Sequence, residues 1–544
     1  MEKAPARVVH LCHFSTLTFA CLLMFAVLSS SPYALAQMDL PVRPAPKPRS
    51  TDHQVAPTKS FAPPVVKLKG RFHLRRLNEV LSLAPLGPVV ASIAHATGPV
   101  TIGINPPNGP LLTLSAPGKG TAVARIHIQE SHVHQADLRL ALENVEASAV
   151  LGNEEAAVEV KSMRIRPQDL PYWNLPVDLV MRSTAGAGTL SFGGTATSAE
   201  GRITATFDGE AGMQDASGRA RFELGPLAFT PDGLQPHQLV PALGASLTAV
   251  RGTVAANGTI TWNGGTPTIS GRLFLRGLSF VAAGVATENL SGTITLERIW
   301  PPQTPPGQVL TIGRIHPGLE ASDGIVRFHL DDRGRLRIEQ AAIGFSGGRL
   351  SLDPVTLDPA VNSQDIVIRA QGLDLQKVLD AANMEAASAS GSVSGRIPVT
   401  LSRQGFLVKG ATLAADAKGF LRYRPSVPPD ALQQEDGNIA LLSSVLTNFH
   451  YERFTVTLDG GNRNEWDSTV HLAGSNPDVL EGHPFILNVT LSVTPGEALV
   501  ELGSEELSVG DTLPLYSALF GLGFLEWLGN TLTAIDDLIP SPNH

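Results

Sequence analysis

The stretch that decides the fold is residues 326–339, VRFHLDDRGRLRIE, in which apolar and polar side chains alternate on both sides of a polar turn. Alternation with period two is typical of a β-strand that has one buried and one solvated face. Asp331 to Gly334 is a turn of the kind that joins two antiparallel strands. The segment therefore predicts a hairpin with arginines on its polar face. The predicted apolar face consists of Val326, Phe328, Leu330, Leu336 and Ile338.

The same pattern extends outward over most of the chain. Between about residues 98 and 510, alternating segments are separated by turn residues roughly every 8 to 14 positions. Gly277 interrupts the alternation of residues 271–280 and predicts a β-bulge. Helical patterns are few: one over 374–383, another within 429–447. We therefore expect a mainly β protein, not the alternating α/β order of a parallel sheet.

Composition limits the functional class. The chain has 544 residues, of which 43% are hydrophobic and 17% charged, and this hydrophobicity is too high for a disordered protein. Only one N-terminal stretch approaches transmembrane length, which excludes a polytopic membrane protein. The 41 basic and 50 acidic residues give a net charge of −9, so we expect no nucleic-acid partner.

The N-terminus predicts export. Lys3 and Arg7 precede an uncharged apolar run, and residues 34–36, ALA, form a small-x-small cleavage site. Residues 1–36 are thus interpreted as a secretory signal peptide, the alternative being a membrane anchor in the inner membrane. Both cysteines, Cys12 and Cys21, lie in this segment. The expected location is the periplasm or cell envelope, and the remaining chain would hold together without disulfides.

The rest of the chain divides into four predicted parts. Residues 37–66 are a proline-rich linker. Residues 67–247 are the N-terminal part of the β structure and begin with an amphipathic helix over about 74–94. Residues 248–512 are a C-terminal β domain. Residues 513–544 are an apolar amphipathic helix and tail.

A one-sided sheet of roughly 30 strands, at about 13 residues for each strand and turn, must cover its apolar face. The few predicted helices are insufficient. Either the sheet curls into an open, elongated groove that receives an apolar ligand, or it is a structural or adhesive β-solenoid with a filled interior. The low aromatic content of 6% favours the groove, because large rings normally fill sandwich cores.

The C-terminal segment is a predicted contact surface. Its apolar residues crowd a stretch too short to span a bilayer, which suits an interfacial helix, a plug in the end of the groove, or an ordinary helix on the core. The predicted contacts with a membrane or partner are Leu519, Phe520, Phe524 and Trp527.

No motif indicates catalysis. Residues 344–348, GFSGG, match the G-x-S-x-G pattern of hydrolases, but another alternating strand follows where that motif requires a helix. His132 and His134 lie two apart on a strand without further ligands at metal-site spacing. We therefore expect a protein that is not an enzyme and that has no catalytic residues, metal site or cofactor.

A set of short segments over about 248–500 resembles, in order and spacing, the C-terminal domain of the YdbH family of Gram-negative bacteria. This family belongs to the wider AsmA/TamB-like group of envelope proteins, and its domain is also labelled "dicarboxylate transport". The matching segments are 250–262, 305–313, 316–319, 345–350, 372–375, 395–399, 446–451, 474–477 and 484–491.

The resemblance implies an AsmA-like curled sheet that carries phospholipid acyl chains between the inner and outer membranes. The implied partners are phospholipid, a membrane surface and a small outer-membrane lipoprotein that adds a β-strand at the C-terminal end. A role in outer-membrane biogenesis follows from the same resemblance. Nothing in the residues supports a soluble dicarboxylate as the cargo.

Overall fold

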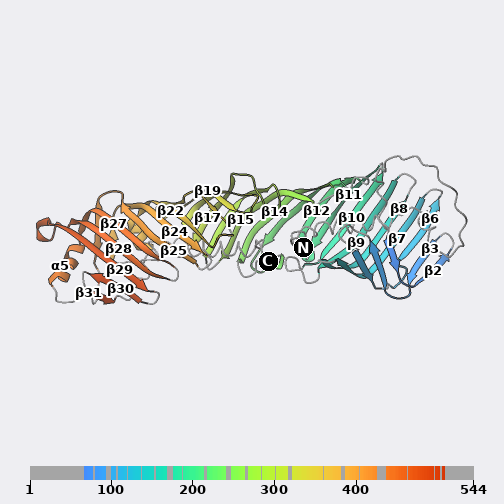
Figure 1. The fold of residues 1–544 in the computed structure, drawn as a ribbon, viewed down its shortest axis with the longest axis horizontal. Helices are drawn as coiled ribbons and strands as arrows, with labels where there is room; N and C mark the ends of the chain where they lie inside the picture. The colour runs from blue at the N-terminus through green and yellow to red at the C-terminus, as the bar shows by residue number, and fades with distance from the viewer. Residues whose placement is uncertain are drawn as a thin grey trace, which may run out of the picture.

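The computed structural model describes residues 66–508 except for short segments, the longest of which are 168–174, 240–246 and 425–436. All 31 described strands belong to one antiparallel sheet, which confirms the predicted mainly β class. The molecule is elongated, and its strands run obliquely to the long axis (Figure 1). Among the described strands, β2 (Phe72–Leu77) pairs only with β3 (Val80–Pro85), and β31 (Glu505–Ser508) pairs only with β30 (Glu497–Leu502). Within the described ranges, the sheet therefore has a free edge at each end.

The N-terminal end of the sheet is branched. Two short branches, β1–β4–β5 and β2–β3–β6, both join β7. The remaining bounds in this region are β1 (Val66–Lys69), β4 (Val89–Ile93), β5 (Val100–Ile104), β6 (Leu112–Gly118) and β7 (Thr121–Gln135).

The predicted helix over 74–94 is wrong, because β2, β3 and β4 occupy this range. Pro85 and Pro88 cannot lie inside a helix without removing hydrogen bonds. The leucines that suggested a helical period instead alternate along paired strands, and Leu74 lies opposite Leu83. Pairing with β6 supplies the hydrogen bonds that an isolated segment of this sequence would lack.

From β7 to β19 the sheet is a continuous meander in which each strand pairs with the next. Connections of two to five residues join most of these strands, which explains the regular turn signals, while longer connections follow β9, β13 and β16. The bounds are β8 (Leu138–Leu151), β9 (Glu155–Pro167), β10 (Val177–Gly186), β11 (Thr189–Ser198), β12 (Ile203–Gly212), β13 (Ser217–Phe229), β14 (Thr248–Asn263), β15 (Thr268–Ala282), β16 (Val285–Leu296), β17 (Gln308–His316), β18 (Ala321–Leu330) and β19 (Leu336–Phe345).

The C-terminal part is less regular, because short strands branch from the main order. β19 pairs with both β20 and β21, and the β23–β26 pair joins the sheet through β27. The bounds are β20 (Gly348–Leu352), β21 (Val355–Leu357), β22 (Ser363–Asp374), β23 (Ala387–Ala389), β24 (Ser392–Ser402), β25 (Gly405–Ala415), β26 (Gly419–Tyr423), β27 (Phe449–Gly461), β28 (Asn464–Ser475) and β29 (Pro484–Thr494).

The helices in the described ranges are short: α3 (Pro236–Leu239), α4 (Leu375–Ala381) and α5 (Gly437–Leu446). Both α4 and α5 lie within the two predicted helical segments. The last turn of α5 is fixed by Asn476, which is fully buried and donates from Nδ2 to the carbonyl oxygens of Ser444 and Val445, both at 3.0 Å. Of these helices, α4 and α5 pack on the C-terminal part of the sheet, while α3 lies in the connection between β13 and β14.

The hairpin predicted for residues 326–339 is confirmed. Phe328 lies opposite Ile338 and Leu330 opposite Leu336, so the predicted apolar residues share one face. Asp331 closes the turn by accepting hydrogen bonds from the backbone nitrogens of Arg333 and Arg335, both at 3.0 Å. The predicted bulge is also present, because the register shifts between Leu275 and Leu278 and Gly277 has a φ of 58°.

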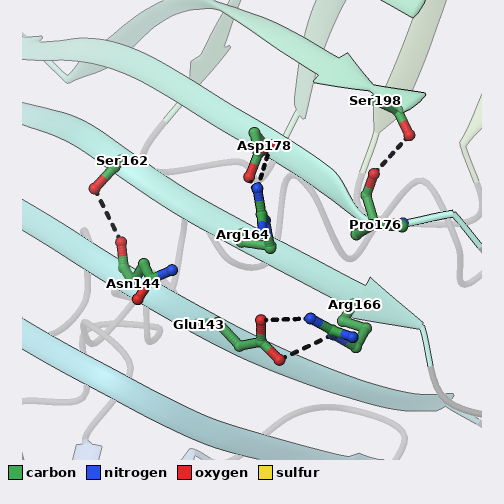
Figure 2. A network of polar contacts seen from close by, with 8 residues as sticks. All are labelled: Glu143, Asn144, Ser162, Arg164, Arg166, Pro176, Asp178 and Ser198. Carbon is green, nitrogen blue, oxygen red and sulfur yellow. Dashed lines mark hydrogen bonds and ion pairs between the residues drawn. The ribbon is translucent and has the colours of Figure 1, made fainter. Parts of the chain in front are cut away.

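The opposite, outer face of the sheet carries ion pairs between neighbouring strands. Arg164 on β9 forms two hydrogen bonds with Asp178 on β10, at 2.7 and 2.9 Å, and Arg166 pairs with Glu143 on β8 (Figure 2). The hydrogen bonds from Arg164 lower the pKa of Asp178 and outweigh the opposing effect of desolvation. Because both side chains are about half exposed, the pair contributes below about 1 kcal/mol.

This ion pair predicts a small, pH-dependent difference between the wild type and an Asp178→Asn variant. The lowered pKa of Asp178 means that its stabilisation is complete above about pH 4 and is lost as pH falls through the folded-state pKa. The melting temperature of the variant should therefore lie slightly below that of the wild type at pH 7 and equal it near pH 2. A difference of the same size at both pH values would contradict the pairing.

Candidate functional site

Strand register places apolar side chains in rows that run across the sheet. We call the face that carries Phe328 and Ile338 the inner face, and each row joins residues that lie opposite one another on successive strands. The C-terminal row crosses from β13 to β24 and, at ~4.8 Å per strand, is on the order of 40 Å long. Its members are Leu227, Val254, Leu275, Gly292, Leu310, Val326, Ala341, Leu352, Ile368 and Ile397.

A second, N-terminal row starts at the free edge β2 and ends on β16. Every member is apolar or glycine, and at ~4.8 Å per strand the row is on the order of 60 Å long. Its members are Leu74, Leu83, Leu112, Ile126, Ala147, Val160, Met181, Gly194, Phe207, Phe222, Gly258, Gly271 and Leu296.

The two rows overlap on the four strands from β13 to β16. A third set of apolar residues lies between them on the same face: Leu224, Ala256, Leu273 and Ile294. The rows therefore form an apolar path without interruption from β2 to β24, although Ser183 and Gln308 also lie on the inner face. Arg272 and Asn257, opposite each other on β15 and β14, belong to the outer face. A continuous apolar surface of this kind can hold a long hydrocarbon chain.

Aromatic residues of the inner face pair with glycines on the neighbouring strand. In four cases the ring atoms lie so close to the glycine that an added Cβ would come within 2.2 to 2.8 Å of them. Each ring therefore lies across the next strand instead of projecting from the sheet. The register pairs are Phe192 with Gly209, Phe207 with Gly194, Phe222 with Gly258, and Trp262 with Gly218. This arrangement makes the inner face of β11–β14 apolar and shallow.

Buried clusters fill the inner face towards both ends, over β4–β11 and from β17 onwards, and a smaller cluster lies around Leu227, Val250 and Leu278 in the middle. Phe192, Phe207, Phe222 and Leu273 are only half-buried. In contrast, a single cluster of buried residues extends from Ile315 to Leu472 and includes residues of α4 and α5. We call this cluster the C-terminal core. The half-buried residues of β11–β17 thus form the less covered part of the inner face, which we call the middle section.

The predicted groove residues lie at the boundary between these two sections. Phe328 and Ile338 are buried, at 8% and 7% exposure, and Ile338 belongs to the C-terminal core. Val326, Leu330 and Leu336 are half-buried, and Val326 is a member of the C-terminal row. The sequence prediction placed all five on one face but did not identify the more exposed residues of β11–β16. The sequence signal for the residues of β11–β16 was the placement of glycines opposite aromatic residues in adjacent strands.

The G-x-S-x-G segment has a structural role. Ser346 and Gly347, in the G-x-S-x-G segment, have φ values of 43° and 78° and form the tight turn between β19 and β20, so no helix follows the serine. Within the described ranges, no three His, Cys, Asp or Glu side chains converge as a metal site would require.

The predicted contact residues Leu519, Phe520, Phe524 and Trp527 lie outside the described residues, as do the predicted signal peptide and linker. None of the helices described is long and apolar enough to cross a membrane.

Comparison with known proteins gives one match. Residues 89–493 match the family described as YdbH-like, intermembrane phospholipid transport protein YdbH. The match begins well before residue 248, so the resemblance seen in the C-terminal half extends over most of the sheet. Neither a curated protein nor a solved structure matches the chain.

Proposed function

Because the chain belongs to the YdbH-like family of intermembrane phospholipid transport proteins, we propose that its inner face carries phospholipid acyl chains along the long axis of the sheet. The chains would lie on the rows of apolar residues, and the headgroups would remain in water at the open side. The observation that carries this proposal is the unbroken path of apolar residues and glycines from β2 to β24, most of whose members on β11–β17 are half-buried.

The energetics explain why the rows must be continuous. Removing a hydrocarbon chain from a bilayer costs about 0.8 kcal/mol for each CH₂ group that enters water, so even four exposed groups cost about 3 kcal/mol. A polar gap one strand wide would expose such a length. In both rows each strand contributes an aliphatic residue, an aromatic residue or a glycine.

The setting and partners form part of the same proposal. We place the protein in the periplasm of a Gram-negative envelope, exported by its N-terminal segment. The free edge of β31 would accept a strand from a small outer-membrane lipoprotein, since an unpaired edge is a template for strand addition. The segment 513–544 would contact the membrane or that partner.

The alternative, a structural solenoid with a filled interior, is favoured by the buried clusters, namely the C-terminal core and those over β4–β11 and around Leu227, Val250 and Leu278. These clusters account for much of the sheet but not for the half-buried apolar side chains of Phe222 and Leu273 in the middle section. A purely structural sheet would have no reason to leave that surface in water.

The proposal predicts that bound lipid contacts Trp262, whose ring lies on the inner face over Gly218. The other four tryptophans, Trp173, Trp300, Trp466 and Trp527, would be replaced by phenylalanine. Phospholipid brominated on its acyl chains should then quench the fluorescence of Trp262, and native mass spectrometry should show phospholipid bound to the chain.

A matched control places the only tryptophan on the outer face, at Asn257, in a variant that also carries Trp262→Phe. This tryptophan should be quenched much less. Equal quenching at both positions, or a chain free of phospholipid after gentle purification, would contradict the proposal.

A further inference from the structure

The charges of the chain are distributed unevenly along its length. Residues 66–129 contain seven lysines and arginines, Lys67, Lys69, Arg71, Arg75, Arg76, Lys119 and Arg125, against the single acid Glu79. Residues 464–508 contain eight acids and no lysine or arginine. These two regions form opposite ends of the long axis (Figure 1). A chain with a net charge of −9 thus has one strongly basic end.

The basic end also exposes large apolar side chains. Leu74, Leu77 and Leu86 are 61%, 76% and 61% exposed. Arginines on a free edge strand are common, because they prevent edge-to-edge pairing. Leucines exposed to this extent would instead favour association of the edge with other apolar surfaces. Protection of the edge therefore does not explain them.

Basic and apolar residues are neighbours at this edge. Along β2, Leu74 and Leu77 flank Arg75 and Arg76, and all four side chains are exposed. The backbone nitrogen of Leu86 donates to the carbonyl oxygen of Arg71 at 2.8 Å, which places this leucine beside the same strand. A surface that binds an anionic bilayer combines two features: leucines that enter the acyl region, and neighbouring arginines that contact the lipid phosphates.

The edge is also continuous with the apolar inner face. Leu74 is the first member of the N-terminal row, followed by Leu83 on β3 and Leu112 on β6. An acyl chain that left a bilayer at β2 would therefore meet the apolar row directly.

We propose that the edge formed by β2 and Leu86 docks on the surface of an anionic phospholipid bilayer. Arg71, Arg75 and Arg76 would bind the headgroup phosphates, while Leu74, Leu77 and Leu86 would enter the interface. Transfer of lipid from the bilayer to the row rests on the proposed function above, whereas the docking itself does not.

The test is co-sedimentation of the full chain with vesicles of phosphatidylglycerol and phosphatidylcholine, compared with phosphatidylcholine alone. The triple variant Arg71→Glu, Arg75→Glu, Arg76→Glu should lower the affinity for the anionic vesicles at least about tenfold, and high salt should weaken wild-type binding similarly. The variant Leu74→Ser, Leu77→Ser, Leu86→Ser should also lower the affinity, but with little change in its salt dependence.

The control is Leu480→Ser with Ile486→Ser, which removes two side chains that are 62% and 74% exposed near the acidic end. It should bind anionic vesicles as the wild type does. Docking at β2 would be overturned if the control lost as much affinity as the leucine variant, or if the arginine variant bound normally. If wild-type chains docked but carried no phospholipid in native mass spectra, the proposed transport would fail while the docking surface stood.

Discussion

A Leu273→Glu variant should retain at least about tenfold less bound phospholipid than the wild type. Leu273 lies on the inner face of β15 between Ala256 and Ile294, and it is half-buried with no ligand present. A carboxylate at this position would remove contacts with two or three CH₂ groups, at about 0.8 kcal/mol each. That loss exceeds the 1.4 kcal/mol that corresponds to a tenfold change. Native mass spectrometry of the purified chain measures the bound lipid.

The matched control is Arg272→Glu, which introduces the same side chain one position earlier, on the exposed outer face. Its bound phospholipid should stay within about twofold of the wild type, because an exposed surface charge contributes little to the packing of the sheet. Equal loss in the two variants would show that lipid does not distinguish the faces, and the inner face would no longer be the binding surface.

A charged substitution on the apolar face of the hairpin of residues 326–339 would be a less informative test of lipid binding. Ile338 is 7% exposed and packs in the C-terminal core. A charge there would be buried without a partner, and this alone destabilises a protein strongly. Loss of lipid binding by Ile338→Lys could then follow from unfolding.

The sequence was sufficient to predict the sheet and its two faces. Alternation depends on nearest neighbours along the strand, so the hairpin of residues 326–339 and the bulge at Gly277 could both be predicted locally. The segment 74–94 was mispredicted because its leucines fit a helical period about as well as an alternating one. The pairing of β3 with β6, about 30 residues further along the chain, decides that this segment forms strands and not a helix.

The character of the inner face could not be predicted in the same way. The low aromatic content favoured an open groove without indicating where the rings lie, and Phe207 and Phe222 lie opposite each other in the middle section. Their rings leave the surface shallow only because Gly194 and Gly258 occupy the facing positions on the next strands. That relation depends on the register of two hairpins at once, and a shift of one residue would abolish it.

The aromatic–glycine pairs also show how a sheet can be apolar without being filled. A ring that projects from the sheet would occupy the space in which an acyl chain could lie. A ring that lies over a glycine adds apolar surface and leaves that space free. In the C-terminal core such a pair is covered: Tyr451 lies over Gly419, which faces it on β26, but Tyr451 and Phe449 are fully buried there, and the Tyr451 hydroxyl donates to the carbonyl oxygen of Ser390 at 2.6 Å.

The contrast between a ring that lies over a glycine and a ring that projects from the sheet yields a prediction. An Ala256→Trp variant should bind about tenfold less phospholipid, although the substitution adds no charge. The residues opposite Ala256 are Leu224 and Leu273, so no glycine faces it on either neighbouring strand. The indole would have to project into the space above the rows. Displacing an acyl chain over two CH₂ groups costs about 1.6 kcal/mol, which exceeds the 1.4 kcal/mol of a tenfold change. Quantification of co-purified phospholipid would measure the effect.

The control places the same ring on the outer face at Asn257, which is exposed. Asn257→Trp should bind phospholipid as the wild type does and melt at a similar temperature. If Ala256→Trp bound a full complement of phospholipid while remaining folded, acyl chains would not lie over β14, and the middle section could not be the path. Leu273→Glu tests the polarity of the inner face and Ala256→Trp tests the space above it, at positions that lie opposite each other on two strands. A lipid-carrying inner face requires that both variants lose bound phospholipid while both controls retain it.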